Sequence, residues 1–243
     1  MNNKVRLVGT LLSDFAFSYE IYGEHFYEAT LKVERLNTEH SDEIPIVVSD
    51  RLIDVQACGI GTRLSIDGQF RSYNKAVEGQ QRKKLMLSVF AKDAAIIVDN
   101  SAFNEDDETS ESDTEVGGDA FEEEVHKPTT LDENEIELFG FICKEPIYRY
   151  TPLGREITDC LIAVNRRYGK SDYIPCIAWG RNSKYLSKLP IGTCVEIKGR
   201  IQSRIYKKRI SETESVSKTV YEVSISSITE IKDSYKDEIA DNN

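Results

Sequence analysis

Apolar and polar residues alternate with a period of two along short stretches of this chain. In the clearest stretch, residues 195–206, aliphatic residues occupy one face, while basic, amide and aromatic residues occupy the other. The aliphatic positions are Val195, Ile197, Ile201 and Ile205, and the opposite positions are Lys198, Arg200, Gln202, Arg204 and Tyr206. A period of two is typical of a half-buried β-strand. We therefore expect a strand here, with its aliphatic face in a core.

The chain carries such segments twice, in the same order. Three segments of the first half return in the second half at a constant offset of 131 residues. They are residues 5–12 and 136–143, residues 22–36 and 153–167, and residues 61–74 and 192–205. Solenoid repeats have periods of roughly 20 to 50 residues. A longer unit, of about the size of a small domain, indicates two copies of one domain fold.

Each copy predicts five short strands, with a helix between the third and the fourth. In the second copy, apolar residues recur at one-turn spacing within Arg181–Leu189, just before Pro190 and Gly192, and this pattern favours a short helix that stops there. Five strands with one such helix fit an oligonucleotide/oligosaccharide-binding (OB) barrel. We predict an all-β fold with short helices, in which two tandem five-stranded OB barrels are joined by an acidic disordered linker.

The repeat and the composition give the expected bounds of these parts. The first barrel covers residues 1–98, the linker 99–133, the second barrel 134–231, and an acidic tail 232–243.

Charge is distributed unevenly along the chain, whose formal net charge is −11. Residues 99–135 hold one Lys or Arg against 15 Asp or Glu, whereas residues 136–231 hold 16 against 10. The second copy is thus a basic domain beside an acidic linker, which buries too little apolar surface to fold alone. The linker is either a solvated spacer or a mimic of nucleic acid that competes for the basic face of the second copy.

Residues that carry catalysis or bind metals are scarce. The histidines His25, His40 and His126 lack metal-ligand spacing, and no Gly-rich phosphate loop or GxSxG motif occurs. The carboxylates concentrate in the linker, where no catalytic geometry can be held. We expect no enzyme activity, no cofactor and no metal site.

Cysteine content and hydropathy indicate a compartment. The five cysteines are odd in number, have apolar neighbours and never form a CxxC pair, so we expect them to be reduced core residues. They are Cys58, Cys143, Cys160, Cys176 and Cys194. No apolar run approaches the roughly 20 residues of a membrane helix, and the N-terminus lacks a signal-peptide pattern. We expect a cytoplasmic protein with no membrane partner.

Aromatic and basic residues interleave in the second copy. Within residues 173–180, alternation places Tyr173 and Trp179 on the face opposite to small aliphatic residues. Single-strand binding requires flat rings that stack on bases and cations that follow the phosphates. The expected stacking residues are Tyr168, Tyr173, Trp179 and Tyr206; the expected phosphate contacts are Arg166, Arg167, Lys170, Arg181, Lys198, Arg200, Arg204, Lys207 and Lys208. A Trp179 that only caps a core is the alternative.

The second copy resembles the bacterial single-stranded DNA-binding protein (SSB) family over most of residues 134–231. The resemblance lies in an ordered set of segments: NEIELFGFI, a G-x-E-x-x-x-x-L-I-A-V-N-R-R run over Gly154–Arg167, DYIPCIAWGR, LPIGTCVEIKGRIQSR and VYEVSIS. It implies an OB fold with base stacking at the four aromatic positions above. It also implies phosphate contacts at Arg167, Arg181, Arg200 and Arg204.

The first copy keeps the scaffold but departs at the stacking positions. Glu43 stands where the second copy has Tyr173, Ser49 where it has Trp179, and Lys75 where it has Tyr206. We expect this domain to bind DNA poorly and to serve self-association or contacts with a protein. The C-terminal residues 236–243 lack the apolar tip that the family uses to dock partners, so the linker is a candidate substitute.

These observations predict binding of single-stranded DNA, with little sequence preference, in replication, recombination or repair. The family commonly assembles four OB domains, which implies that two of these chains form a homodimer. Replication or repair proteins are further expected partners. Two alternatives stay open: a primosomal-type OB adaptor that acts mainly through protein contacts, with its basic face covered by the linker, and binding of single-stranded RNA.

Overall fold

The computed structural model describes residues 2–35, 38–75, 84–98, 131–209 and 215–232. The linker expected at residues 99–133 and the tail expected at 232–243 lie almost wholly outside these ranges.

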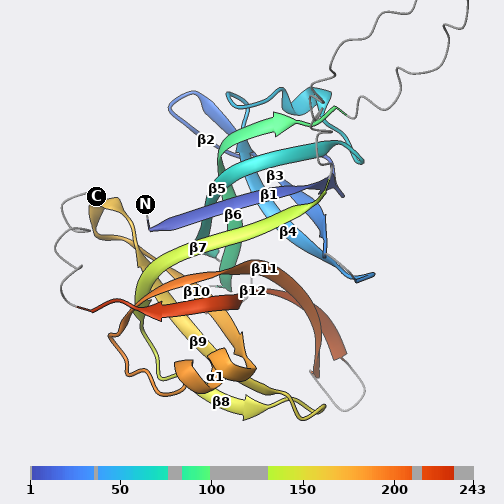
Figure 1. The fold of residues 1–243 in the computed structure, drawn as a ribbon. Helices are drawn as coiled ribbons and strands as arrows, with labels where there is room; N and C mark the ends of the chain where they lie inside the picture. Colours follow the sequence, from blue (N-terminus) through green and yellow to red (C-terminus); the bar gives the residue numbers. More distant parts are fainter. Residues whose placement is uncertain (1, 36–37, 76–83, 99–130, 210–214, 233–243) are drawn as a thin grey trace, which may run out of the picture.

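The first copy forms a closed barrel with one added strand (Figure 1). Its strands are β1 (Asn3–Leu11), β2 (Ala16–Ile21), β3 (Glu24–Glu34), β4 (Ser41–Ser49), β5 (Arg63–Lys75) and β6 (Lys84–Ile96). Five of them close a ring in the order β1-β3-β4-β6-β5, which returns to β1. The strand β2 lies outside the ring and pairs only with β3 among the described strands.

The second copy repeats this topology. Its strands are β7 (Glu133–Ile142), β8 (Ile147–Tyr150), β9 (Glu156–Asn165), β10 (Ser171–Trp179), β11 (Cys194–Arg209) and β12 (Ser215–Glu230). The ring runs β7-β9-β10-β12-β11, and β8 is the added strand on β9. The prediction of two tandem five-stranded OB barrels is confirmed, and each barrel carries one edge strand that the sequence analysis did not expect.

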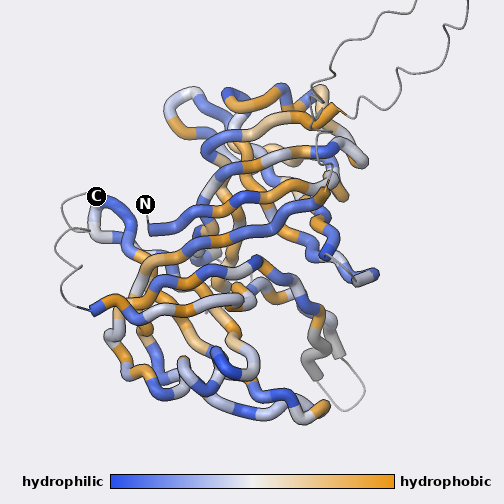
Figure 2. Tube along the Cα trace, in the orientation of Figure 1, coloured by the Kyte–Doolittle hydropathy of each residue, from blue (hydrophilic) through white to orange (hydrophobic). Residues whose placement is uncertain are grey.

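Alternating side chains form the two cores, and Figure 2 shows apolar and polar residues alternating along the strands. Ile174, Cys176 and Ala178 of β10 are buried, as the pattern predicted. Ile205 was expected on a core face but is 70% exposed, because the 16-residue strands β11 and β12 extend as a paired hairpin past the barrel. No disulfide joins the five cysteines, all of which lie in the described ranges; four are buried, and Cys143 is partly exposed.

The predicted helix is present in the second barrel alone. The helix α1 (Gly180–Leu186) follows β10 and ends three residues before the expected Leu189. In the first barrel, a 3₁₀ turn over Val55–Ala57 takes its place, with the Asp54 side chain accepting a hydrogen bond from the backbone N–H of Gln56 at 3.0 Å.

The two barrels are joined by strand pairing, so that all twelve strands form one sheet. The strand β1 pairs antiparallel with β7, from Asn3 opposite Leu138 to Val8 opposite Glu133. At the centre, Val5 lies opposite Ile136, and these two residues occupy the same position in the two copies. The barrels are therefore related by a pseudo-two-fold axis, like the subunits of a symmetric dimer.

Two buried carboxylates reinforce this junction in a pseudo-symmetric way. The backbone N–H of Ser72 in β5 donates to Asp172 at 2.6 Å, and the backbone N–H of Ser203 in β11 donates to Asp42 at 2.8 Å. Asp42 is 0% and Asp172 2% exposed. Each carboxylate also pairs with an arginine of its own barrel, Arg35 or Arg166. Buried charges of this kind are stable only when paired and hydrogen-bonded.

A glycine allows each barrel to close. An alanine Cβ at Gly140 in β7 would lie 2.5 Å from the carbonyl oxygen of Ala163 in β9, and Gly9 in β1 meets β3 in the same way. At both places, backbone from another strand occupies the space that a side chain needs.

We expect Gly140→Ala to lower the free energy of unfolding by about 1–3 kcal/mol, because the barrel must open to admit the methyl group. Urea unfolding followed by circular dichroism measures this. Gly59→Ala is the control, since its nearest neighbour would be the Asp14 carboxylate at 3.7 Å, an ordinary contact. Equal stability of the two variants would contradict the packing argument.

Candidate nucleic-acid interface

Three of the predicted stacking rings lie at the surface of the second barrel. Tyr173 and Trp179, at the two ends of β10, are 46% and 37% exposed. Tyr168, in the turn that leads into β10, is 96% exposed. Ile174, Cys176 and Ala178 between them point into the core, so the rings stand on the outer face of the strand, where Ile177 between them is buried. The exposure of Trp179 favours an open ring over a core cap.

Strand register extends this face across the sheet. Tyr173 lies opposite Ala163 of β9, and Trp179 lies opposite Ile157, which lies in turn opposite Arg149 of β8. Directly paired residues share one face of a sheet. The face that carries the rings therefore continues over β9 to the edge strand β8, where Ile147 is 63% exposed. Ile147 and Arg149 were not predicted, because the four residues of IYRY are too few to show a clear period.

Four of the nine predicted phosphate contacts already hold carboxylates. Arg166 pairs with Asp172, and Arg200 pairs with Asp42 at 2.8 Å. Because these partners are buried at the junction of the barrels, Arg166 and Arg200 have a structural use there. Burial, followed by the nearby charge of Arg35, lowers the pKa of Arg200.

The other two pairs differ in burial, because both side chains of Lys198–Glu137 are about half exposed, whereas the Glu222 carboxylate that pairs with Arg204 is buried. Lys198 contacts Glu137 at 2.9 Å and Arg204 contacts Glu222 at 3.0 Å, and both basic side chains are about half exposed. An exposed ion pair contributes roughly 0–1 kcal/mol, so a phosphate can replace Glu137 at small cost, whereas loss of Arg204 would leave the buried Glu222 carboxylate without its cation.

Three further predicted contacts are exposed and unpaired. Arg167, Lys170 and Arg181 make no ion pair with any residue in the described ranges. Arg167 and Lys170 flank Tyr168 in the turn before β10, and Arg181 follows Trp179 in α1. The predicted residues Tyr206, Lys207 and Lys208 belong to β11, but their side chains lie outside the described part of the structure.

The turn before β10 has an unusual backbone. Tyr168 has φ 64° and ψ 34°, and Gly169 has φ 67°. This left-handed region suits glycine and asparagine and disfavours other side chains. A tyrosine in this conformation lowers the free energy of unfolding. Strained residues of this kind are often found at functional sites.

The sequence analysis also missed basic residues of the first barrel. Arg71 in β5 and Lys92 in β6 line a cavity at the junction, together with Arg166, Arg167 and Tyr168 of the second barrel. No sequence pattern relates these strands to the turn before β10, because only the pairing of the barrels brings them together.

The described residues contain no group of three or more metal-ligating side chains. None of their helices is long and apolar enough to span a membrane.

Known proteins resemble this chain in sequence and in fold. The model of the single-strand binding protein family matches residues 133–230. Single-stranded DNA-binding protein 2 of Listeria innocua is 33% identical over 98 residues, which cover 36% of this chain and 62% of that protein. Single-stranded DNA-binding protein A of Bacillus subtilis is 31% identical over 83 residues, which cover 31% of this chain and 48% of that protein. The chain thus spans less than two thirds of these curated relatives.

The fold has a counterpart among solved structures that covers both barrels. The crystal structure of the single-stranded DNA-binding protein from Thermus aquaticus superposes with a TM-score of 0.65 at 17% identity, over 95% of this chain and 93% of that chain. The second barrel is thus similar in sequence to the single-strand binding protein family, in agreement with the resemblance seen in the sequence.

Proposed function

We propose that this protein binds single-stranded DNA, with little sequence preference, mainly on the second barrel. The observation that supports the proposal is the row of exposed rings, Tyr168, Tyr173 and Trp179, beside the exposed cations of the same elements. The curated relatives that match this barrel are named single-stranded DNA-binding proteins, which favours DNA binding over a role as a protein adaptor.

The chemistry of binding is stacking combined with charge neutralisation. Each base that stacks on an aromatic ring contributes about 1–3 kcal/mol. Arg167, Lys170 and Arg181 neutralise phosphates beside the rings. Lys198 exchanges Glu137 for a phosphate, and the half-exposed Arg204 contacts a phosphate while it keeps Glu222. Every base has a flat face, so such a surface tolerates any sequence. In a duplex the bases are stacked on one another, so the rings select single strands.

We propose that this binding serves replication, recombination or repair in the bacterial cytoplasm, at the nucleoid. The protein holds and protects a strand and performs no reaction on it, and it uses no cofactor. Replication or repair proteins are its proposed partners.

The first barrel has a different proposed role. At the position of Trp179 it has Ser49, which is buried and donates a hydrogen bond to Glu24 at 2.5 Å. At the position of Tyr173 it has Glu43, a carboxylate in place of a ring; the two backbone N–H groups make equivalent contacts across the junction, Glu43 with Ser203 at 2.9 Å and Tyr173 with Ser72 at 2.8 Å. Neither position offers a ring to a base, so we propose that the first barrel acts mainly in association.

We further propose that two chains form a homodimer with four barrels. The strand β1 is already paired with β7 of the same chain, so the contact between chains must use another surface. Size-exclusion chromatography with light scattering should give twice the chain mass of 27.6 kDa. A single species at 27.6 kDa over the micromolar range would remove the dimer and leave the DNA-binding proposal intact.

The single tryptophan of the chain, Trp179, reports on binding directly. We expect oligo-dT to quench its fluorescence strongly, because a base stacks on the ring, and duplex DNA of the same length to leave it unchanged. The log of affinity should fall against the log of salt concentration with a slope near −0.7 for each phosphate contacted. The same titration with oligo-U tests binding of single-stranded RNA. An unchanged signal with oligo-dT at low salt would sink the stacking model.

The turn before β10 permits a test that separates binding from stability. We expect Tyr168→Asn to weaken oligo-dT binding by about 5- to 150-fold, the equivalent of one lost stacking contact. Thermal stability should be equal or higher, since asparagine tolerates the left-handed backbone. Fluorescence anisotropy of a labelled oligo-dT measures the affinity.

The matched control is Tyr22→Asn in the turn before β3. Tyr22 is 99% exposed, has φ 51° and is followed by Gly23 with φ 75°. The same substitution is thus made in the same backbone conformation on the other barrel. Equal affinities of the two variants would show that Tyr168 does not stack on a base.

A further inference from the structure

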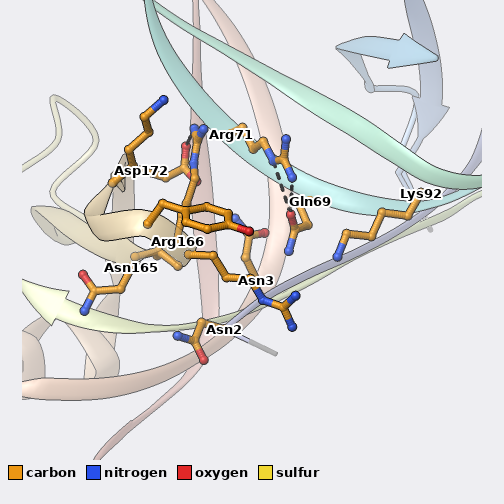
Figure 3. Close-up of a pocket in the computed structure, with 12 residues that line it drawn as sticks. Asn2, Asn3, Gln69, Arg71, Lys92, Asn165, Arg166 and Asp172 are labelled. Atoms are coloured by element: carbon orange, nitrogen blue, oxygen red, sulfur yellow. Dashed lines mark hydrogen bonds and ion pairs between the residues drawn. The ribbon is translucent and has the colours of Figure 1, made fainter. Parts of the chain in front are cut away.

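A basic cavity lies where the two barrels meet (Figure 3). It has a volume of about 570 Å³ and is lined by β5 and β6 of the first barrel and by the turn before β10 of the second. Among the lining residues, five basic side chains face one carboxylate, Asp172. The basic residues are Arg71, Lys92, Arg166, Arg167 and Lys170. Figure 3 shows Arg71 and Lys92 entering from the side opposite to Asn165 and Arg166.

The one carboxylate of this cavity is already in use. Asp172 is 2% exposed, pairs with Arg166 and accepts the backbone N–H of Ser72. Its negative charge is therefore largely balanced by Arg166 and this N–H group, and it does little to balance the other four basic side chains.

Arg71 is held in place by neutral groups. Its Nε and one terminal nitrogen donate to Oε1 of Gln69 at 3.2 and 2.8 Å, and its guanidinium lies 5.2 Å from the centre of the Phe90 ring. Stacking on a ring and a hydrogen bond to an amide fix a guanidinium without balancing its charge. Arg71 is thus oriented in advance at the cavity wall.

The cations of this cavity also crowd one another. Burial, followed by the charge of Arg166, lowers the pKa of Arg71. Burial, followed by the charges of Arg71 and Arg167, lowers the pKa of Lys92. Like charges close together destabilise one another, and an anion between them relieves the repulsion.

The pseudo-two-fold axis supplies an internal comparison. A second cavity of about 400 Å³ lies at the equivalent place on the other side of the junction, and in it five carboxylates face two arginines. The carboxylates are Glu34, Asp42, Asp132, Glu133 and Glu135, and the arginines are Arg35 and Arg200. Glu34 stands where the basic cavity has Asn165, and Glu133 stands where it has Asn2. One backbone arrangement thus carries opposite charge on its two sides, so the positive charge is not required by the fold.

We propose that the basic cavity holds a backbone phosphate of the bound single strand, so that the strand passes from Tyr168 onto the first barrel at Arg71 and Lys92. This rests on the proposed function and extends the binding surface to a barrel that has lost the stacking residues of β10. Tyr168 lines the same cavity, so a strand stacked on its ring has its next phosphate at the cavity mouth. The acidic cavity leaves only this side open to a polyanion.

The test is the double variant Arg71→Gln/Lys92→Gln, with oligo-dT binding measured by anisotropy at several salt concentrations. We expect weaker binding and a log-log salt slope shallower by about 0.7–1.4, the value for one or two lost phosphate contacts. The control is Lys32→Gln/Arg51→Gln, which removes the same charge from exposed positions of the first barrel that pair with Glu34 and Glu24. The log-log salt slope of this control variant should equal that of the unmodified protein.

A conservative variant guards against a folding defect. Arg71→Lys/Lys92→Arg keeps both charges and should restore most of the affinity and the original slope. If the glutamine variant matches the control variant while the unmodified protein still binds oligo-dT, the cavity holds no phosphate and the proposed function stands. If the unmodified protein does not bind oligo-dT at all, the proposed function fails, and this inference fails with it.

Discussion

The antiparallel pairing of β1 with β7 is the interaction on which the rest of this structure depends. An unpaired strand at the edge of a sheet exposes a row of hydrogen-bonding groups, and here each barrel satisfies the first strand of the other. Because Val5 lies opposite Ile136, the same surface is used on both sides. A symmetric contact that commonly joins separate subunits is thereby made within one chain. The buried Asp42 and Asp172 then lock the barrels by accepting backbone N–H groups across the junction.

Two copies held in this way are free to diverge in their side chains. The outer face of β10 keeps the rings of Tyr173 and Trp179, while the equivalent positions in β4 carry the Glu43 carboxylate and the buried Ser49, which bonds to Glu24. The two cavities beside the axis differ in the same manner, since one is basic and the other acidic. A symmetric dimer of identical subunits cannot make this distinction. Because the two copies belong to one chain, the junction can have one basic side and one acidic side. A bound single strand can then prefer the basic side.

Local patterns in the sequence were sufficient to predict the barrels and the exposed rings. Alternation placed Ile174 and Cys176 inside and Trp179 outside, because side chains of a strand alternate between its faces. Local sequence patterns could not show that Arg166 and Arg200 would form ion pairs with buried carboxylates at the junction. They also could not bring Arg71 near Tyr168, since both depend on pairing between strands more than a hundred residues apart. The edge strand β8 was missed because four residues are too few for a clear period.

The most direct test of this account is a crystal structure of the full chain with an oligo-dT long enough to leave the second barrel. The account predicts bases stacked on Trp179, Tyr173 and Tyr168, with a phosphate between Arg71, Lys92 and Arg167 in the basic cavity. A strand bound on the first barrel alone, or one that crosses the junction beside Glu34 and Glu133, would contradict it.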